Sequence, residues 1–130
     1  VRSEKPGNYE SAVDIALNSQ SAKPLIGTNT TIGVVVTNAQ LTTTQLKQIA
    51  NMAHDGLARA VRPVHTQFDG DTMFAISMPD SVQSGESVAE SLLNTVGIAA
   101  AKVMELAIID AVKSAESIGG VVASCDWAKK

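Results

Sequence analysis

The sequence is poor in aromatic, cysteine and basic residues, and each shortage argues against a class of protein. Two Phe, one Tyr and one Trp occur among 130 residues, so an aromatic platform for stacking nucleic-acid bases is almost absent. Ten Lys and Arg against 13 Asp and Glu give a formal net charge of −3, whereas domains that bind phosphate backbones are normally basic. A single Cys excludes an internal disulfide framework and a cysteine-rich zinc site. No nucleic-acid partner is therefore expected.

Long apolar runs are also missing. No uninterrupted run approaches the ~18 residues of a membrane span, so no membrane partner is expected. The chain begins with Val1 and not with Met, and no basic segment followed by an apolar one opens it, so no signal peptide is expected. We expect a processed product, an engineered fragment or an incomplete reading frame. One cysteine does not identify a compartment. A soluble protein is favoured, with the cytoplasm preferred over the periplasm.

The residues that are present suffice for one small α/β domain. Hydrophobic residues make up 45% of the chain, and 130 residues can bury a core without disulfides or metal. Thr42 and Gln45 have the spacing of a helix capping box. The helical region over residues 88–117 is expected to be one helix strained at Gly97, or two helices. Together with the helix over residues 43–61, it should cover one side of a sheet. The patterns predict, in order, a short strand over 11–17, a strand over 30–38, a helix over 43–61, a strand over 73–78 and the long helical region over 88–117.

The strand entrance Asn29-Thr30-Thr31 is the first candidate catalytic feature. A threonine hydroxyl is not ionised at neutral pH and needs a base, which can be the residue's own α-amine once the preceding peptide bond is cut. That chemistry requires Thr, Ser or Cys at the start of a rigid strand, and Thr30 precedes a Val-rich strand. The alternative is that threonine stands there for steric reasons alone. The local pattern by itself favours that alternative.

The loop around Gly70 is the second candidate. Asp69 and Asp71 flank this glycine, and such carboxylates can orient a hydroxyl, hold an ammonium group or bind a cation. The alternative is a solvated Asx turn in which Gly70 supplies a positive φ, and the local pattern favours it. A calcium loop is not expected, because no bidentate glutamate follows at the required distance.

A metal site is the third possibility, because His54, Asp55 and His65 accompany the two loop aspartates. The two histidines are separated by Pro63 and form no HExxH-type pair on one helix face. A helix-surface His54 and a packed loop His65 are favoured instead. No metal and no other cofactor is therefore expected, and Cys125 is expected to be a bystander thiol.

Three longer segments together resemble one peptidase family. They are NTTIGVVVTNAQLT (29–42), QIANMAHDGLARAVRPVHTQFDGDTMFAIS (48–77) and NTVGIAAAKVMELAIIDAV (94–112). They are similar to the DmpA-type family of D-/L-aminopeptidase/esterases, β-peptidyl aminopeptidases and nylon-oligomer hydrolases. The ungapped run MAHDGLARAVRPVHTQFDGDT is the most specific part. In that family, the similar region is the smaller, C-terminal β subunit of a precursor that cleaves itself.

The resemblance implies a cleavage between Asn29 and Thr30 that makes Thr30 an N-terminal nucleophile. Asp69 and Asp71 match positions that support the nucleophile by hydrogen bonding in the nylon-hydrolase branch. The implied fold is α/β (α+β), an αββα sandwich resembling the Ntn-hydrolases, of which this chain would be the C-terminal part.

The resemblance also implies a division of the chain and a function. Residues 1–29 would be the tail of the α portion, and residues 30–130 the β-subunit-like catalytic region. The implied activity is hydrolysis of short peptides or amides through an acyl-enzyme. The implied partners are the missing α portion, which completes the sandwich and supplies oxyanion donors, and further αβ units in a homo-oligomer. Two alternatives remain open: a truncated, inactive module that self-associates, and an acyltransferase with the same nucleophile.

Overall fold

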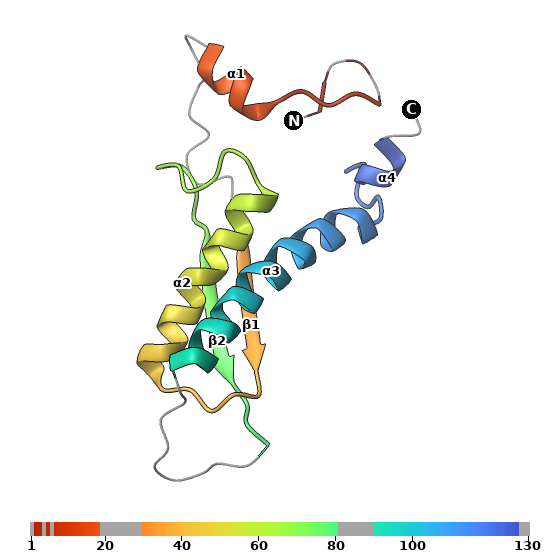
Figure 1. Cartoon of the computed structure of the whole chain (residues 1–130). Coiled ribbons are helices and arrows are strands. Elements are labelled where there is room, and N and C mark those ends of the chain that lie inside the picture. Colours follow the sequence, from red (N-terminus) through yellow and green to blue (C-terminus); the bar gives the residue numbers. More distant parts are fainter. Residues whose placement is uncertain (1, 4, 6, 19–29, 81–89, 128–130) are drawn as a thin grey trace.

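The computed structural model describes residues 2–3, 5, 7–18, 30–80 and 90–127. These residues combine helices with a small parallel sheet, which is the expected α/β class (Figure 1). The elements in chain order are α1 (Ala12–Asn18), β1 (Ile32–Thr37), α2 (Thr43–Ala60), β2 (Thr72–Ser77), α3 (Glu90–Ser114) and α4 (Ser124–Trp127).

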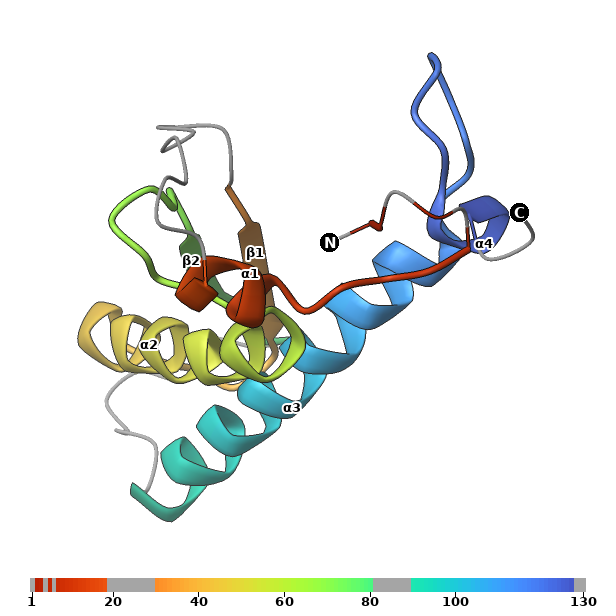
Figure 2. The same cartoon turned by 90° about the horizontal axis from the view of Figure 1, so that it is seen from above.

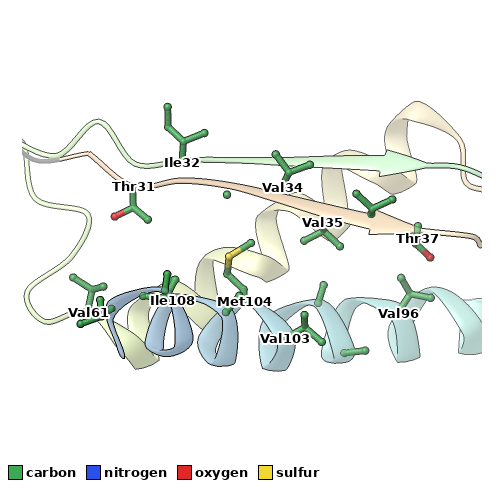
Figure 3. A pocket seen from close by; sticks show the side chains of 17 residues that line it. Thr31, Ile32, Val34, Val35, Thr37, Val61, Val96, Val103, Met104 and Ile108 are labelled. Carbon is green, nitrogen blue, oxygen red and sulfur yellow. The ribbon is translucent and has the colours of Figure 1, made fainter. Parts of the chain in front are cut away.

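The two strands are parallel neighbours, and α2 forms the connection between them. Their register runs from Ile32 opposite Thr72 to Thr37 opposite Ser77, so they match over their whole length. Side chains alternate between the two faces of the sheet. In Figure 3, Ile32 and Val34 point away from α3, whereas Val35 points toward it.

The central helix α2 begins and ends at the signals that the sequence carries. The Thr42 side chain accepts a hydrogen bond from the Gln45 backbone N–H, and the Gln45 side chain accepts one from the Thr42 backbone N–H. This capping box satisfies backbone donors that have no partner within the helix. The helix ends at Ala60, before Pro63.

α2 and α3 pack side by side on one face of the sheet (Figure 2). The core lies where they meet the strands, and its buried residues are Ile49, Ala53, Leu57, Met73, Ala100 and Met104. Small and flexible side chains let the two helices approach the sheet closely. The expectation that the helices cover one side of the sheet is confirmed.

α3 is one continuous helix of 25 residues, so the alternative of two helices is wrong. Gly97 is buried within α3 and faces Met52 of α2. A Cβ at position 97 would lie too close to the Met52 sulfur and would collide with it. The glycine therefore serves close packing between helices and does not interrupt α3.

α3 is also the one helix of the described residues that is long and apolar enough, by length and composition, to cross a membrane. It passes that test although Lys102 and Glu105 interrupt its apolar sequence and form an ion pair at 3.3 Å. Only 22% of its most apolar window is buried. A helix that packs against the core of a soluble domain can meet the same length and composition limits.

The strand predicted over residues 11–17 is wrong, because these residues form helix α1. The Ser11 hydroxyl accepts a hydrogen bond from the Asp14 backbone N–H at 3.2 Å, as an N-cap does. Seven residues are too few for periodicity to distinguish a strand from two helical turns. Next to α1 in sequence, the first residues contact α4: the Tyr9 hydroxyl lies 3.2 Å from the Ser124 hydroxyl, and the Arg2 guanidinium lies 5.2 Å from the centre of the Trp127 ring.

None of the described helices covers the face of the sheet opposite α2 and α3, which is called the open sheet face below. Its side chains are large and apolar, and each is between 45% and 69% exposed: Ile32, Val34, Val36, Phe74 and Ile76. Contiguous apolar surface of this kind on a soluble protein usually marks a contact with another protein segment.

Candidate functional site

The structure brings the first two candidate features together at one end of the sheet. Thr30 lies two residues before β1, and the loop of residues 62–71 leads directly into β2. Because the strands are parallel, both entrances lie at the same edge. The Thr31 carbonyl accepts a hydrogen bond from the Thr72 backbone N–H at 2.9 Å, which ties the two entrances together.

Gly70 faces the Thr30 side chain. A Cβ placed on Gly70 would lie 2.8 Å from Thr30 Oγ1, closer than real Cβ atoms approach other atoms. The φ of Gly70 lies outside the left-handed region, so the expected positive φ at this position is wrong. A glycine is needed here because it leaves room for the threonine hydroxyl.

Asp71 anchors the entrance of β1. Its Oδ1 accepts a hydrogen bond from the Thr31 backbone N–H at 2.9 Å, and only 7% of its side chain is exposed. A hydrogen bond to an ionised carboxylate is stronger than one between neutral groups. Asp71 therefore fixes the peptide group that follows the candidate nucleophile.

Asp69 has a different partner. Its Oδ2 accepts a hydrogen bond from the Thr66 backbone N–H at 2.8 Å, and its own backbone N–H donates to the Thr66 carbonyl at 3.1 Å. This reciprocal pair closes the loop on itself, as an Asx-type turn does. The described contacts of Asp69 thus shape the loop, whereas those of Asp71 reach the start of β1.

Both histidines of the sequence lie at the same corner. Their ring centroids are 4.9 Å apart, with the planes at 60°, and His65 Nδ1 lies 3.7 Å from Asp71 Oδ2. The expectation of a surface His54 and a packed His65 is wrong. His54 is half-buried, with its Nδ1 enclosed and without a hydrogen-bond partner in the described part of the chain, whereas the side chain of His65 is 42% exposed.

A metal site finds no support among the described side chains, where no group of three or more His, Cys, Asp or Glu could hold an ion. Asp55 is exposed on α2, and Cys125 is a free, exposed thiol.

An apolar groove of about 660 Å³ runs between β1 and α3 and begins at Thr31. Its floor and walls are small aliphatic side chains (Figure 3), among them Val35, Val96, Val103 and Ile108. Such a lining can accept apolar groups but offers little polar chemistry. The groove therefore extends the candidate site without adding acids or bases to it.

Taken together, the corner holds a hydroxyl, a buried carboxylate and two imidazoles. Asn29, on the other side of the expected cleavage, lies outside the described residues. Sequence reasoning named Thr30, Asp69 and Asp71 as candidates but weighed His65 only as a metal ligand or a packed loop residue. The MAHDGLARAVRPVHTQFDGDT run already carried the signal, because both histidines belong to it together with the loop aspartates.

Comparison with known proteins identifies the family. The model of "Peptidase family S58" matches residues 5–124. An uncharacterized aminopeptidase of Mycobacterium leprae is 40% identical over 118 residues, which cover 85% of this chain and 33% of the relative. A 6-aminohexanoate-oligomer endohydrolase of Kocuria sp. is 33% identical over 90 residues, which cover 65% of this chain and 25% of that protein. The chain thus spans about a third or less of these relatives. With a family model matched over most of its length, the chain belongs to peptidase family S58.

Proposed function

We propose that the chain is the catalytic part of a self-processing amide hydrolase. Thr30, freed by cleavage of the Asn29–Thr30 bond, is its N-terminal nucleophile. The observation that carries this proposal is the packing of the Thr30 hydroxyl against Gly70, beside a strand entrance that Asp71 anchors. A nucleophile has to be held rigidly, because small misplacements of a reacting atom are costly.

Self-cleavage needs only atoms of the chain and one water molecule. The Thr30 Oγ attacks the carbonyl carbon of Asn29, the C–N bond breaks, and the former amide nitrogen takes the hydroxyl proton. The product is an ester between Asn29 and the Thr30 oxygen, with a free α-amine on Thr30. Water then hydrolyses the ester and leaves a carboxylate on Asn29.

The same residue then serves in turnover. An unperturbed α-amine titrates at about 7.7–8.0, so part of it is neutral at working pH and can accept the hydroxyl proton. The Thr30 oxygen attacks the substrate carbonyl, the amine product leaves with that proton, and an acyl-enzyme remains until water releases the acid. Asp71 holds the following peptide group during these steps, and Asp69 keeps the loop closed around Gly70.

The substrates that this chemistry serves are short peptides or amides. The names of the relatives support the class, since one is an aminopeptidase and another an endohydrolase of 6-aminohexanoate oligomers. The partner is the polypeptide that corresponds to the rest of the relatives' length. Its place is the open sheet face, where side chains such as Val34 and Phe74 are half exposed. The complete unit is then a homo-oligomer of such αβ pairs.

Substitutions of Thr30 test the nucleophile in the complete protein. Thr30→Ala removes the hydroxyl and should abolish hydrolysis of L-alanine p-nitroanilide, a chromogenic aminopeptidase probe. Thr30→Ser keeps the hydroxyl and loses only a methyl, so it should retain part of the activity. Hydrolysis by Thr30→Ala at the wild-type rate would refute the assignment.

The second candidate function is an inactive module that associates with copies of itself. The open apolar face favours it, because that surface needs a partner whether or not the site is active. The two functions differ in one measurable respect. The module would stay uncut and inactive while forming oligomers, whereas the hydrolase is cleaved and turns over the probe.

A further inference from the structure

The imidazole of His65 lies against Asp71 and His54. Its Nδ1 is 3.7 Å from Asp71 Oδ2, which is beyond hydrogen-bond length but within the range of an ion pair. The other oxygen of the same carboxylate accepts the hydrogen bond from the Thr31 backbone N–H. The ring of His54 meets the His65 ring edge-on from α2. Asp71 is therefore engaged from two sides, by the β1 entrance and by His65.

The backbone at His65 is held in an unusual conformation. Its φ is 57°, in the left-handed region that non-glycine residues seldom adopt and that Asn, Asp and His tolerate better than most. Such conformations persist where the surroundings determine them, and they concentrate at functional sites. The chain therefore accepts strain at a residue whose side chain is turned toward the candidate site.

We propose that His65 is a positioning residue for the nucleophile, an inference that rests on the proposed function. Its imidazole restrains the Asp71 carboxylate, and that carboxylate fixes the Thr31 N–H. This N–H belongs to the peptide group that starts at the Thr30 carbonyl, so its orientation sets the backbone of Thr30. His65 acts through Asp71 and does not itself touch the reacting hydroxyl.

A matched pair of variants in the complete protein tests the proposal. His65→Asn and His65→Asp have the same shape, and both tolerate a positive φ. Asparagine still offers an N–H toward Asp71, whereas aspartate puts a second negative charge there. We expect His65→Asn to keep the Asn29–Thr30 cleavage rate within about threefold, and His65→Asp to lower it by ~10- to 100-fold. With L-alanine p-nitroanilide as the substrate, His65→Asp should lower kcat and leave KM unchanged.

A second readout does not depend on activity. Hydrogen exchange of the Thr31 amide is measured in the uncut Thr30→Ala protein that carries each His65 variant. A restrained Asp71 keeps this amide protected. Exchange should be faster with His65→Asp than with His65→Asn, while the melting temperatures of the two stay alike, because the side chain is 42% exposed.

Each outcome decides one of the two claims. Equal cleavage rates and equal Thr31 exchange in the two variants would overturn the positioning role, whether both match the wild type or both are impaired. A further loss from His65→Asp in an Asp71→Asn background would also overturn it, because His65 would then act by another route. If the wild type is not cleaved and does not hydrolyse the probe, the proposed function fails, and Thr31 exchange still decides the role of His65.

Discussion

The two ends of the parallel sheet use similar residues for different purposes. At the carboxyl end, the Ser77 hydroxyl donates to the Ala39 carbonyl at 2.6 Å and accepts from the Leu41 N–H at 3.3 Å, and the Thr37 hydroxyl accepts from the Ala39 N–H. These hydroxyls form hydrogen bonds with the backbone N–H and C=O groups of the turn that leads into α2. At the amino end, the hydroxyl of Thr30 faces Gly70, and the acid Asp71 holds the chain.

The difference shows why the candidate site is placed as it is. In open α/β sheets, ligands usually bind beyond the carboxyl ends of the strands. A nucleophile that uses its own α-amine has to be the first residue of a chain, so a strand can carry it only at its beginning. The amino end of β1 meets that condition, and the loop before β2 delivers the carboxylates to the same edge.

The largest loss of function that we predict at the amino end, after loss of the nucleophile itself, comes from Asp71→Asn. The variant keeps an oxygen that can accept from the Thr31 N–H, but it removes the charge that strengthens this bond and changes the group that faces His65. We expect the rate of Asn29–Thr30 cleavage, followed by mass spectrometry, to fall by ~10²-fold. A wild-type rate would mean that the Asp71 charge has no role in the cleavage.

Gly70→Ala should have the next largest effect. The added methyl would lie 2.8 Å from Thr30 Oγ1, and the backbone at Gly70 does not require a positive φ, so the main consequence is displacement of the hydroxyl. We expect a loss of about tenfold or more in cleavage rate. Gln67→Ala, an exposed change in the same loop, is the control and should leave the rate unchanged. Equal rates in the two variants would mean that the packing against Gly70 has no part in catalysis.

Asp69→Asn should matter less for the rate than Asp71→Asn. Its carboxylate accepts from Thr66 within the loop, so its removal weakens the turn more than it moves Thr30. We expect the free energy of unfolding to fall by about 1 kcal/mol, measured by denaturant titration, and the cleavage rate to fall only a few-fold. A rate loss as large as that of Asp71→Asn would show that the two aspartates share one role.

Ser77→Ala, at the opposite end of the sheet, should have the smallest effect on function. It removes a hydroxyl that bonds to two backbone groups of the turn, at an expected cost of about 1 kcal/mol in the free energy of unfolding. The cleavage rate at 25 °C should stay at the wild-type value. A slower cleavage rate would mean that a change at the carboxyl end of the sheet affects the candidate site at the amino end.

The fold was predictable where the sequence pattern is long and bounded. β1, α2 and β2 lie within a residue or two of the expected ranges, because β-branched runs, the Thr42 capping box and Pro63 each mark a boundary. The structure of residues 11–17 was not predictable, because seven residues fit both the period of a strand and the period of a helix. The continuity of α3 was not predictable either, because Gly97 packs against Met52 of α2, and such a contact between elements leaves no local signature.

The candidate site residues were named from the sequence, but their contacts could not be predicted from it. Thr30 and the two aspartates became the favoured candidates through the resemblance of the segments that carry them, and parallel pairing brings these segments to one edge. That Asp69 bonds to its own loop while Asp71 bonds to Thr31 depends on side-chain directions that spacing does not encode. The contact between His65 and Asp71 depends likewise on the left-handed backbone at His65, which composition does not reveal.

The most direct test of the central claim is the intact mass of the complete protein under denaturing conditions, for the wild type and for Thr30→Ala. We predict that the wild type separates into two polypeptides, the second beginning with Thr30, and that Thr30→Ala remains one chain. A wild type that stays uncut, or a Thr30→Ala protein that is cut at the same bond, would contradict the assignment of Thr30 as a self-generated N-terminal nucleophile.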